Sequence, residues 1–218
     1  MQDRGSSVSA LPCINQMGYS HASMAATKQK SEISITRKRP GRLTKELWLE
    51  RSIHLLEKRG PTAMTIESLT RHLGVTTGSF YWHFKSHAGF LGELTDKYIQ
   101  DYTYVLSDHL AALDLPPREL LLEAMREIIT IGLGGMDLHF RSLAISYPSL
   151  AAKIRAMDKH RTSTITDLFR GMGYTGDELR MRVHIFVILH SMEHAMITGL
   201  PPKDRLKLLE ERTKLLVD

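Results

Sequence analysis

The amino-acid sequence predicts an all-α protein with a small N-terminal helix-turn-helix domain and a larger C-terminal helical domain. Three observations predict this class. Apolar residues recur at helical spacing from residue 44 onward. No stretch shows strand alternation of useful length, and glycine and proline pairs separate the helical stretches. We expect a disordered leader at residues 1–36, the helix-turn-helix domain at 37–90 and the helical domain at 91–218.

Composition and charge restrict the classes of function. One cysteine, Cys13, permits no internal disulfide, which fits a reducing compartment. The sequence has neither a long apolar run for a transmembrane helix nor the apolar segment of a signal peptide. Residues 37–90 hold ten lysines and arginines against four acidic residues, whereas residues 91–218 hold sixteen against eighteen. A basic module on a near-neutral body indicates a polyanion partner for that module.

The N-terminal stretch before the first helix has two parts. Residues 1–36 are rich in Ser, Ala, Gln and Lys and show no helical or strand period, which predicts disorder. A basic cluster follows, formed by Arg37, Lys38, Arg39 and Arg42. Such an arm can lie in the minor groove of DNA, where the potential is most negative. A solvated run of charges with no specific partner is the alternative.

Three helices are predicted in the helix-turn-helix domain. The first spans Thr44 to Arg59 and ends at Gly60-Pro61. Its buried stripe consists of Trp48, Leu49, Ser52, Ile53, Leu55 and Leu56.

Two short capped helices follow between Thr65 and His87. Thr65 and Thr76 can each act as an N-cap, with apolar residues at the staple positions on either side. Gly74 ends the first of these helices, because glycine adopts the left-handed conformation without strain. Two capped starts split by a glycine turn are typical of a helix-turn-helix.

The second capped helix has an inner and an outer face. Phe80 and Phe84 are four residues apart and can both point into the three-helix core. The outer face then carries Thr77, Gly78, Ser79, Trp82 and His83. This polar set suits a DNA groove better than a protein core.

The stretch GVTTGSFYWHFKSH resembles the recognition-helix signature of the TetR family of transcriptional regulators. The similarity is strong from about Thr44 to Leu94, and beyond it the chain agrees with the family only in length and helical plan. The resemblance implies a DNA-binding set formed by Arg37, Lys38, Arg39, Arg42, Thr65, Thr76, Thr77, Gly78, Ser79, Tyr81, Trp82, His83, Lys85 and His87.

Roles within this set follow from the resemblance. Thr77, Gly78 and Ser79 would face the bases, whereas Tyr81, Trp82 and His83 would contact phosphates and base edges. Lys85 would support the backbone contacts, and Thr65 would meet a phosphate at a helix N-terminus. His87 is a departure, because the family usually has lysine or arginine there. A phosphate contact at His87 would be weaker or pH-dependent.

The resemblance also implies a function. We expect a sequence-specific transcriptional regulator in the bacterial cytoplasm, acting as a homodimer on a palindromic operator in double-stranded DNA. It would be a repressor released by a small apolar effector, and a ligand-gated activator is the alternative. The sequence indicates no cofactor, no metal and no enzymatic activity.

The remaining helices are predicted from breaks and apolar periodicity. A long helix from Gly89 to about Leu113 would join the two domains. The later helices are expected at 117–132, 136–146, 149–172 and 177–198, with a last helix after Pro201-Pro202. Gly134-Gly135 is expected to separate the first two of these.

Two apolar sets are predicted in the helical domain. An effector cavity would be lined by Met125, Ile129, Met136, Phe140, Phe169 and Met172, although such residues can equally form plain core. The helices near the C-terminus carry more apolar surface than one small bundle can bury. They predict a dimer interface formed by Val183, Phe186, Val187, His190, His194, Leu206 and Leu209.

One motif indicates a different chemistry. His190, Glu193 and His194 fit H-x-x-E-H, the inverted motif of zinc hydrolases, with both histidines on one helical face. A short pattern arises easily in a chain with 11 histidines, so a zinc hydrolase is the unfavoured alternative.

Overall fold

The computed structural model describes residues 43–195 and 199–218, and the described chain is helical with no strand. This confirms the all-α prediction. Residues 40–218 form one compact unit, so the boundary placed at residue 90 stays a prediction. The predicted leader (1–36) and the basic arm of Arg37, Lys38, Arg39 and Arg42 lie outside the described residues.

The helix-turn-helix domain forms as its caps predict. Thr65 Oγ1 accepts a hydrogen bond from Ser68 N at 3.2 Å, and Thr76 Oγ1 accepts one from Ser79 N at 3.3 Å. Gly74 ends the first of the two short helices with φ 67°. The elements are α2 (Lys45–Arg59), the 3-10 turn η2 (Pro61–Ala63), α3 (Ile66–Leu73) and α4 (Thr77–His83).

An aromatic cluster forms the core of this domain. Trp48 of α2 is fully buried and meets Phe80 and Phe84 edge-on, with ring centroids 5.7 and 6.0 Å apart. Phe90, from the next helix, lies 5.0 Å from Phe84. Because edge-to-face pairs of this kind add to the burial of apolar area, they fix α4 against α2 and α5.

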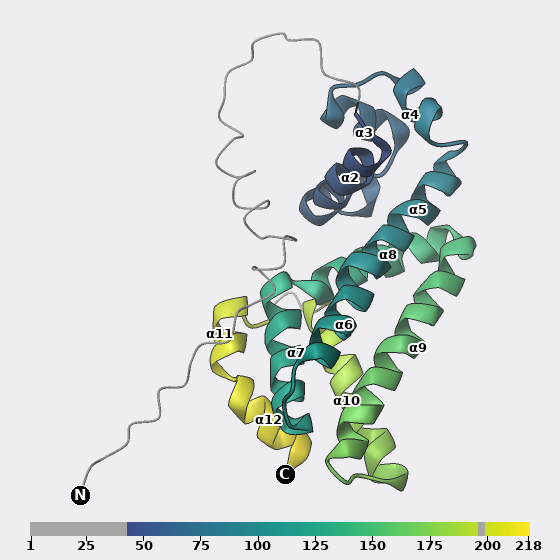
Figure 1. The fold of residues 1–218 in the computed structure, drawn as a ribbon. Helices are drawn as coiled ribbons and strands as arrows, with labels where there is room; N and C mark the ends of the chain where they lie inside the picture. The colour runs from purple at the N-terminus through teal and green to yellow at the C-terminus, as the bar shows by residue number, and fades with distance from the viewer. Residues whose placement is uncertain (1–42, 196–198) are drawn as a thin grey trace, which may run out of the picture. The chain divides into compact units, whose positions relative to one another are not determined.

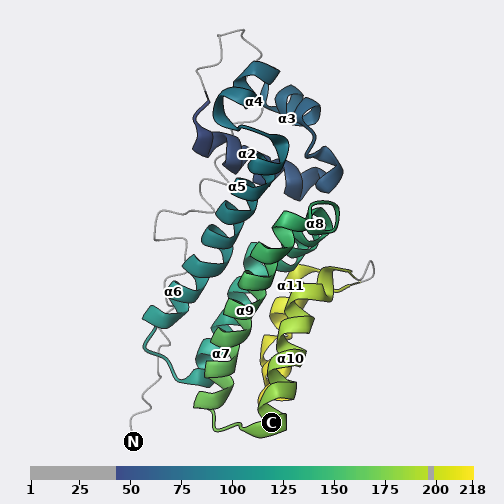
Figure 2. The same cartoon turned by 90° about the vertical axis from the view of Figure 1, so that its right-hand side faces the viewer.

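One long helical rod leaves this domain and enters the body (Figures 1 and 2). It consists of α5 (His87–Ile99), the π-helical segment η3 (Gln100–Tyr104) and α6 (Val105–Ala112). The predicted helix from Gly89 to Leu113 therefore exists, with one π-helical segment near its middle. Short π segments are frequent at functional sites.

The body is a bundle in which α9 and α10 pack along each other and both contact α8 (Figure 2). Its elements are α7 (Pro117–Ile131), α8 (Leu133–Ser146), α9 (Pro148–Gly171), α10 (Gly176–Met192), the 3-10 turn η4 (Glu193–Ala195), α11 (Pro202–Lys207) and α12 (Leu209–Val217). In the described part, no single helix is long and apolar enough to cross a membrane, and only the bent pair α7–α8 passes that test together.

The break between α7 and α8 differs from the prediction. It lies at Gly132, which adopts φ 72°, and Gly134 and Gly135 are inside α8. Gly134 is required by packing, since an added Cβ would lie 2.5 Å from Nδ1 of His194 and 2.8 Å from the carbonyl oxygen of His190. The glycine pair therefore permits a close approach of α8 to η4 and does not break a helix.

The C-terminal helices are also shorter than predicted. The helix expected at 177–198 ends at Met192 and continues as the turn η4, and residues 196–198 are not described. The last helix is divided at Leu208 into α11 and α12.

Replacing Gly134 with alanine should lower the free energy of unfolding by about 1–3 kcal/mol, because the new methyl group meets backbone at 2.8 Å. Gly135→Ala is the matched control, since its Cβ would meet only Cδ2 of His194 at 3.6 Å. That variant should be neutral or up to about 1 kcal/mol more stable. Urea unfolding of both variants measures the difference, and equal stabilities would contradict the close packing.

Candidate nucleic-acid interface and ligand cavity

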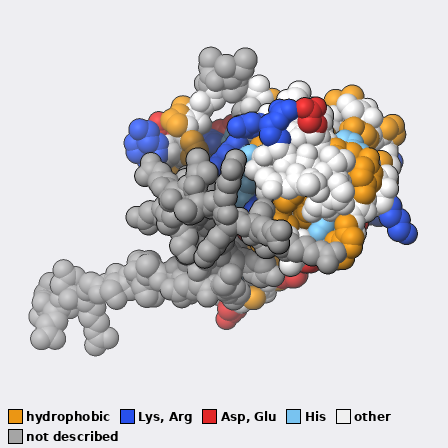
Figure 3. Space-filling view, turned by 90° about the horizontal axis from the view of Figure 1, so that it is seen from above, with side chains coloured by type: hydrophobic (Ala, Val, Ile, Leu, Met, Phe, Trp, Pro, Cys, Tyr) orange, Lys and Arg blue, Asp and Glu red, His pale blue; other side chains and the backbone are white. Residues whose placement is uncertain are grey.

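The outer face of α4 exposes two large aromatic side chains. Tyr81 is 55% exposed and Trp82 62% exposed, and Thr76, Thr77, Gly78 and Lys85 are exposed beside them. Ser79 is half-buried at the edge of this face. In the view from above, Lys and Arg side chains lie next to uncharged and apolar ones (Figure 3). A surface of exposed aromatic rings, hydroxyls and a cation is suited to a partner with bases and phosphates.

The capping threonines have a positioning role that the structure makes explicit. The hydroxyl oxygens of Thr65 and Thr76 are occupied by the first-turn N–H groups of α3 and α4. Both residues are exposed. They therefore hold the starts of the two helices while their own backbone stays at the surface.

His83 does not share the outer face of α4. Its ring is half-buried, 6.4 Å from the Trp48 ring and 6.0 Å from the Phe84 ring. Its Nε2 atom is buried and has no hydrogen-bond partner within the described chain. This corrects the prediction that His83 faces outward with Trp82, because the short helix turns this side chain back toward α2.

His87 connects the helix-turn-helix domain to the body. Its Nε2 lies 2.5 Å from the carbonyl oxygen of Met64, and its Nδ1 lies 3.3 Å from the hydroxyl of Tyr147, between α8 and α9. A carbonyl oxygen only accepts, so Nε2–H donates to Met64, and the Tyr147 hydroxyl is the hydrogen-bond partner of Nδ1. Both ring nitrogens of His87 thus have partners within the protein. Neither is free to contact a DNA phosphate as expected.

A cavity lies between the π-helical segment and helices α7 to α10. The space between protein atoms amounts to about 550 Å³ here, and this volume includes open solvent. Its walls are lined by Tyr102, Thr103, Leu106, Ser107, Leu110, Ala124, Ile128, Leu133, Asp137, Arg161, Thr164, Ile165, Phe186, Val187, His190 and Ser191.

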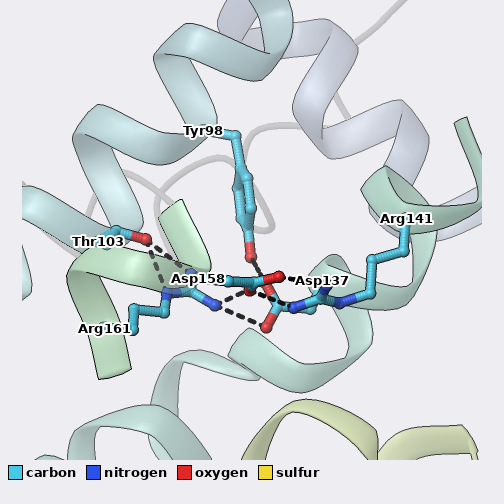
Figure 4. A network of polar contacts seen from close by, with 6 residues as sticks. All are labelled: Tyr98, Thr103, Asp137, Arg141, Asp158 and Arg161. Carbon is cyan, nitrogen blue, oxygen red and sulfur yellow. Dashed lines mark hydrogen bonds and ion pairs between the residues drawn. The ribbon is translucent and has the colours of Figure 1, made fainter. Parts of the chain in front are cut away.

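A buried ion pair forms one wall of the cavity (Figure 4). Nη1 of Arg161 donates to both carboxylate oxygens of Asp137, at 2.9 and 2.7 Å. Nε and Nη2 of Arg161 donate to the Thr103 hydroxyl at 3.0 and 2.7 Å. Tyr98 donates to Oδ1 of Asp137 at 2.5 Å. The network therefore joins α5, η3, α8 and α9 at one point.

The electrostatics of this network keep it in one protonation state. Burial raises the pKa of Tyr98 well above its usual value, and the adjacent Asp137 carboxylate raises it further. Burial alone would lower the pKa of Arg161, but the Asp137 carboxylate outweighs this effect and raises it. Tyr98 is therefore a neutral donor and Arg161 a cation, whose charge Asp137 compensates.

His190 also lines the cavity. Its Nδ1 lies 2.8 Å from the carbonyl oxygen of Phe186 in the preceding helical turn, so Nδ1 carries the proton. Burial lowers the pKa of His190 to about 4, with smaller contributions in the same direction from Arg212 and Arg205. The ring is therefore neutral, and its Nε2 is an acceptor with no partner in the described part of the chain.

The six residues predicted to line an effector cavity are not among those that line this one. Five are buried in two separate core clusters, one with Met136 and Phe140 and the other with Met125, Ile129 and Phe169, against which Met172 packs. Apolar character at helical spacing marks the core, whereas the cavity wall mixes apolar and polar residues. In the sequence, the cavity could have been recognised from polar residues on otherwise apolar helix faces, above all from Asp137 in α8.

The residues predicted to form a dimer interface are covered within the subunit, and the interface stays a prediction. Val183, Phe186, His190 and Leu209 are buried within the subunit, and Val187, Leu206 and His194 are half-buried. They face inward because α10 packs against α8 and α9 on that side. The opposite side of α10 exposes Met181, Ile185, Ile188 and Met192, spaced four, three and four residues apart. We call this set the α10 stripe.

The H-x-x-E-H motif is engaged in other contacts. The Glu193 carboxylate pairs with Arg212 at 2.6 Å and with Arg205 at 3.4 Å. Nε2 of His194 lies 3.0 Å from a guanidinium nitrogen of Arg205. Among the described residues, no group of three or more His, Cys, Asp or Glu side chains is arranged to hold a metal ion. This geometry gives the zinc-hydrolase alternative no support.

Comparison with known proteins assigns the N-terminal part of the chain to a family model. Residues 49–94 match the model described as "Bacterial regulatory proteins, tetR family". This confirms the resemblance found in the recognition-helix sequence. No curated protein sequence matches the chain.

Solved structures match over most of the chain. The reduced form of NemR from E. coli has a TM-score of 0.65 at 14% identity, over 80% of this chain and 97% of that one. FadR from Bacillus subtilis in complex with stearoyl-CoA has a TM-score of 0.61 at 14% identity, over 80% and 98%. The ketosteroid regulator KstR2 of Mycobacterium tuberculosis has a TM-score of 0.61 at 14% identity, over 84% and 97%. At these identities the matches establish the fold.

The buried neutral His190 predicts a pH dependence of stability. The unfolded chain binds a proton at His190 near pH 6.5, but the folded chain binds it only near pH 4. The free energy of unfolding should therefore fall by up to about 3 kcal/mol from this residue as the pH drops through that window.

Urea unfolding at pH 7.5, 6 and 5 measures the effect in the wild type and in His190→Gln, which has no titrating ring. The wild type should lose more stability on acidification than the variant. Identical pH profiles would show that His190 is not held neutral by the fold.

Proposed function

We propose that the protein is a repressor that binds a palindromic operator and is released by a small apolar effector, because residues 49–94 match the tetR family model and a solved TetR-family regulator from Thermus thermophilus shares the fold. The observation that carries the proposal is the exposed face of α4. Tyr81 and Trp82 are more than half exposed there, although aromatic residues of this size are normally covered. A partner surface that stacks on and accepts hydrogen bonds from them explains this exposure.

The face divides into two kinds of contact. Thr77, Gly78 and Ser79 are at the start of α4, where short side chains let the backbone approach base edges in the major groove. Tyr81 and Lys85 are better placed for phosphates, which set affinity and register. Thr65, at the exposed start of α3, is suited to one further phosphate.

The α10 stripe supports a homodimer. Four apolar side chains on one face of one helix leave a continuous apolar surface that a soluble subunit rarely exposes. A second copy of the same helix covers it in a closed two-fold arrangement. Two α4 helices related by this axis would read half-sites about 34 Å apart, so the operator is expected to be palindromic.

The route from cavity to DNA runs through the α5–η3–α6 rod. Thr103 and Tyr102 of the π segment line the cavity, and the same rod begins at His87 beside the recognition helix. A ligand that disturbs the contact between Thr103 and Arg161 would move or loosen α5. The bridge from His87 to Met64 and Tyr147 would carry the change into the helix-turn-helix domain.

An activator is the second candidate, because the same surfaces would serve a regulator that recruits polymerase. A transcription assay on the operator, with and without the protein, decides the sign of regulation.

Selection from a random DNA library with the full chain tests the proposal. We expect enrichment of a two-fold symmetric site, with affinity that falls steeply as salt rises because phosphate contacts release counterions. Failure to enrich any sequence would overturn the proposal and favour an interaction protein of another kind.

Substitutions on α4 should separate base reading from phosphate contact. Ser79→Ala or Thr77→Ala should change the preferred bases, at about 1–3 kcal/mol for each lost contact. Tyr81→Phe and Lys85→Ala should weaken all sites roughly alike. Binding of each variant to the same sequence library measures this. If Ser79→Ala and Tyr81→Phe alter the profile in the same way, the division of roles is wrong.

A charge placed in the α10 stripe should disrupt the dimer. Ile188→Glu puts a carboxylate into the proposed interface and should shift the protein to monomers in sedimentation velocity. Ile145→Glu is the matched control, because Ile145 in α8 is exposed but lies outside the stripe. A dimer that survives Ile188→Glu but dissociates with Ile145→Glu would place the interface elsewhere.

A further inference from the structure

The lining of the cavity restricts the chemistry of what it can hold. Besides the hydroxyl groups of Tyr102, Ser107, Thr164 and Ser191, it has two polar regions, the Asp137–Arg161–Thr103 cluster and His190. Each of the two regions has a definite charge and hydrogen-bonding state, and together they restrict the class of ligand.

The first region offers no free charge. The Arg161 guanidinium uses Nη1 on Asp137 and uses Nε and Nη2 on Thr103. The carboxylate of Asp137 is 99% covered by its surroundings and also accepts from Tyr98. An anionic ligand would meet a guanidinium whose charge Asp137 already compensates, and its own charge would lie close to that carboxylate. A cationic ligand would in turn lie close to the charge of Arg161.

The second region offers a hydrogen-bond acceptor. His190 is 6% exposed, and the bond from Nδ1 to Phe186 fixes the tautomer, so Nε2 presents a lone pair. This lone pair has no partner in the described chain. A buried acceptor without a donor is costly, and a ligand that brings a donor gains by satisfying it.

The charges behind His190 keep it in this state. Arg205 and Arg212 share the single carboxylate of Glu193, and Arg205 also contacts His194. None of these four residues lines the cavity. Their excess positive charge opposes protonation of His190, so the ring stays an acceptor.

We propose that the cavity binds an uncharged, largely apolar molecule with a hydroxyl group, an alcohol or a phenol, which donates its hydrogen to Nε2 of His190. The apolar part lies along Leu106, Leu110, Ile128 and Ile165, and the ion pair of Asp137 and Arg161 stays intact beside it. His190 is the residue that sets specificity. The inference rests on the proposed function only in taking this cavity as the effector site.

Three probes with one skeleton test the ligand class: 4-butylphenol, its methyl ether 4-butylanisole and the anion 4-butylbenzoate. Isothermal titration of the full chain without DNA at pH 7.5 gives their affinities. The phenol should bind about tenfold tighter than the ether, which cannot donate, since one hydrogen bond is worth about that factor. It should bind tighter than the benzoate by at least the same factor.

Two variants assign the preference to His190. In His190→Leu, the phenol and the ether should bind within about twofold of each other. In His190→Gln, a side-chain carbonyl can accept in place of Nε2, so the preference for the phenol should persist. Thermal unfolding checks that both variants fold, and if His190→Leu does not, the three probes on the wild type and on His190→Gln decide.

Several results would overturn the proposal: equal affinities for the phenol and the ether, tightest binding of the benzoate, no binding of any probe, or a phenol preference that survives in His190→Leu. The titration contains no DNA and the operator selection contains no ligand. The two proposals therefore fail separately, since a phenol-selective cavity in a protein that selects no DNA would refute only the regulatory function.

Discussion

The structure depends on the buried ion pair between Asp137 and Arg161. A buried carboxylate in this position is stable because both of its oxygens accept from Arg161 and Oδ1 also accepts from Tyr98. Arg161 in turn fixes Thr103 in the π-helical segment. One charged pair therefore connects the rod that begins at the DNA-binding domain to α8 and α9, which both line the cavity.

This arrangement explains how two distant surfaces can influence each other. The rod is attached to the body at several points: His87 at its start, Asp96 and Tyr98 in α5, Thr103 near its middle and Ser107 in α6. Thr103 lines the cavity, and His87 lies near α4 at the start of the rod. A displacement at Thr103 can thus reach α4 through packed contacts, first along the helix α5 and then through the ring of His87.

Sequence reasoning was strongest where local rules decide the structure. The caps at Thr65 and Thr76 and the turn at Gly74 are properties of a few adjacent residues, so they fixed α3 and α4 correctly. It was weakest where a tertiary contact decides. A glycine such as Gly134 is typical of a helix break, but here its missing side chain leaves room for the ring of His194.

The same limit applies to the site residues. Periodicity identified the apolar faces of α7 to α10 without telling which face meets the subunit's own core and which is exposed. The sequence therefore predicted an interface at Val183 and Phe186, which are buried within the subunit, whereas Ile185 and Ile188 are exposed. The pairing of Asp137 with Arg161 joins residues on different helices, and no local pattern encodes it. His87 was identified as unusual from its departure from the family, but its bridging contacts needed the structure.

The central claim is that Thr103 ties the cavity to the DNA-binding domain, and one comparison of operator affinities tests it most directly. Thr103→Val removes the acceptor for Arg161, whereas Thr95→Val in the same rod removes only a bond to the Leu91 carbonyl, and both residues are buried. The account predicts that Thr103→Val binds the selected operator about fivefold more weakly, because the π-helical segment loses its bond to Arg161, and that Thr95→Val binds as the wild type does. Equal operator affinities for Thr103→Val and the wild type would contradict it.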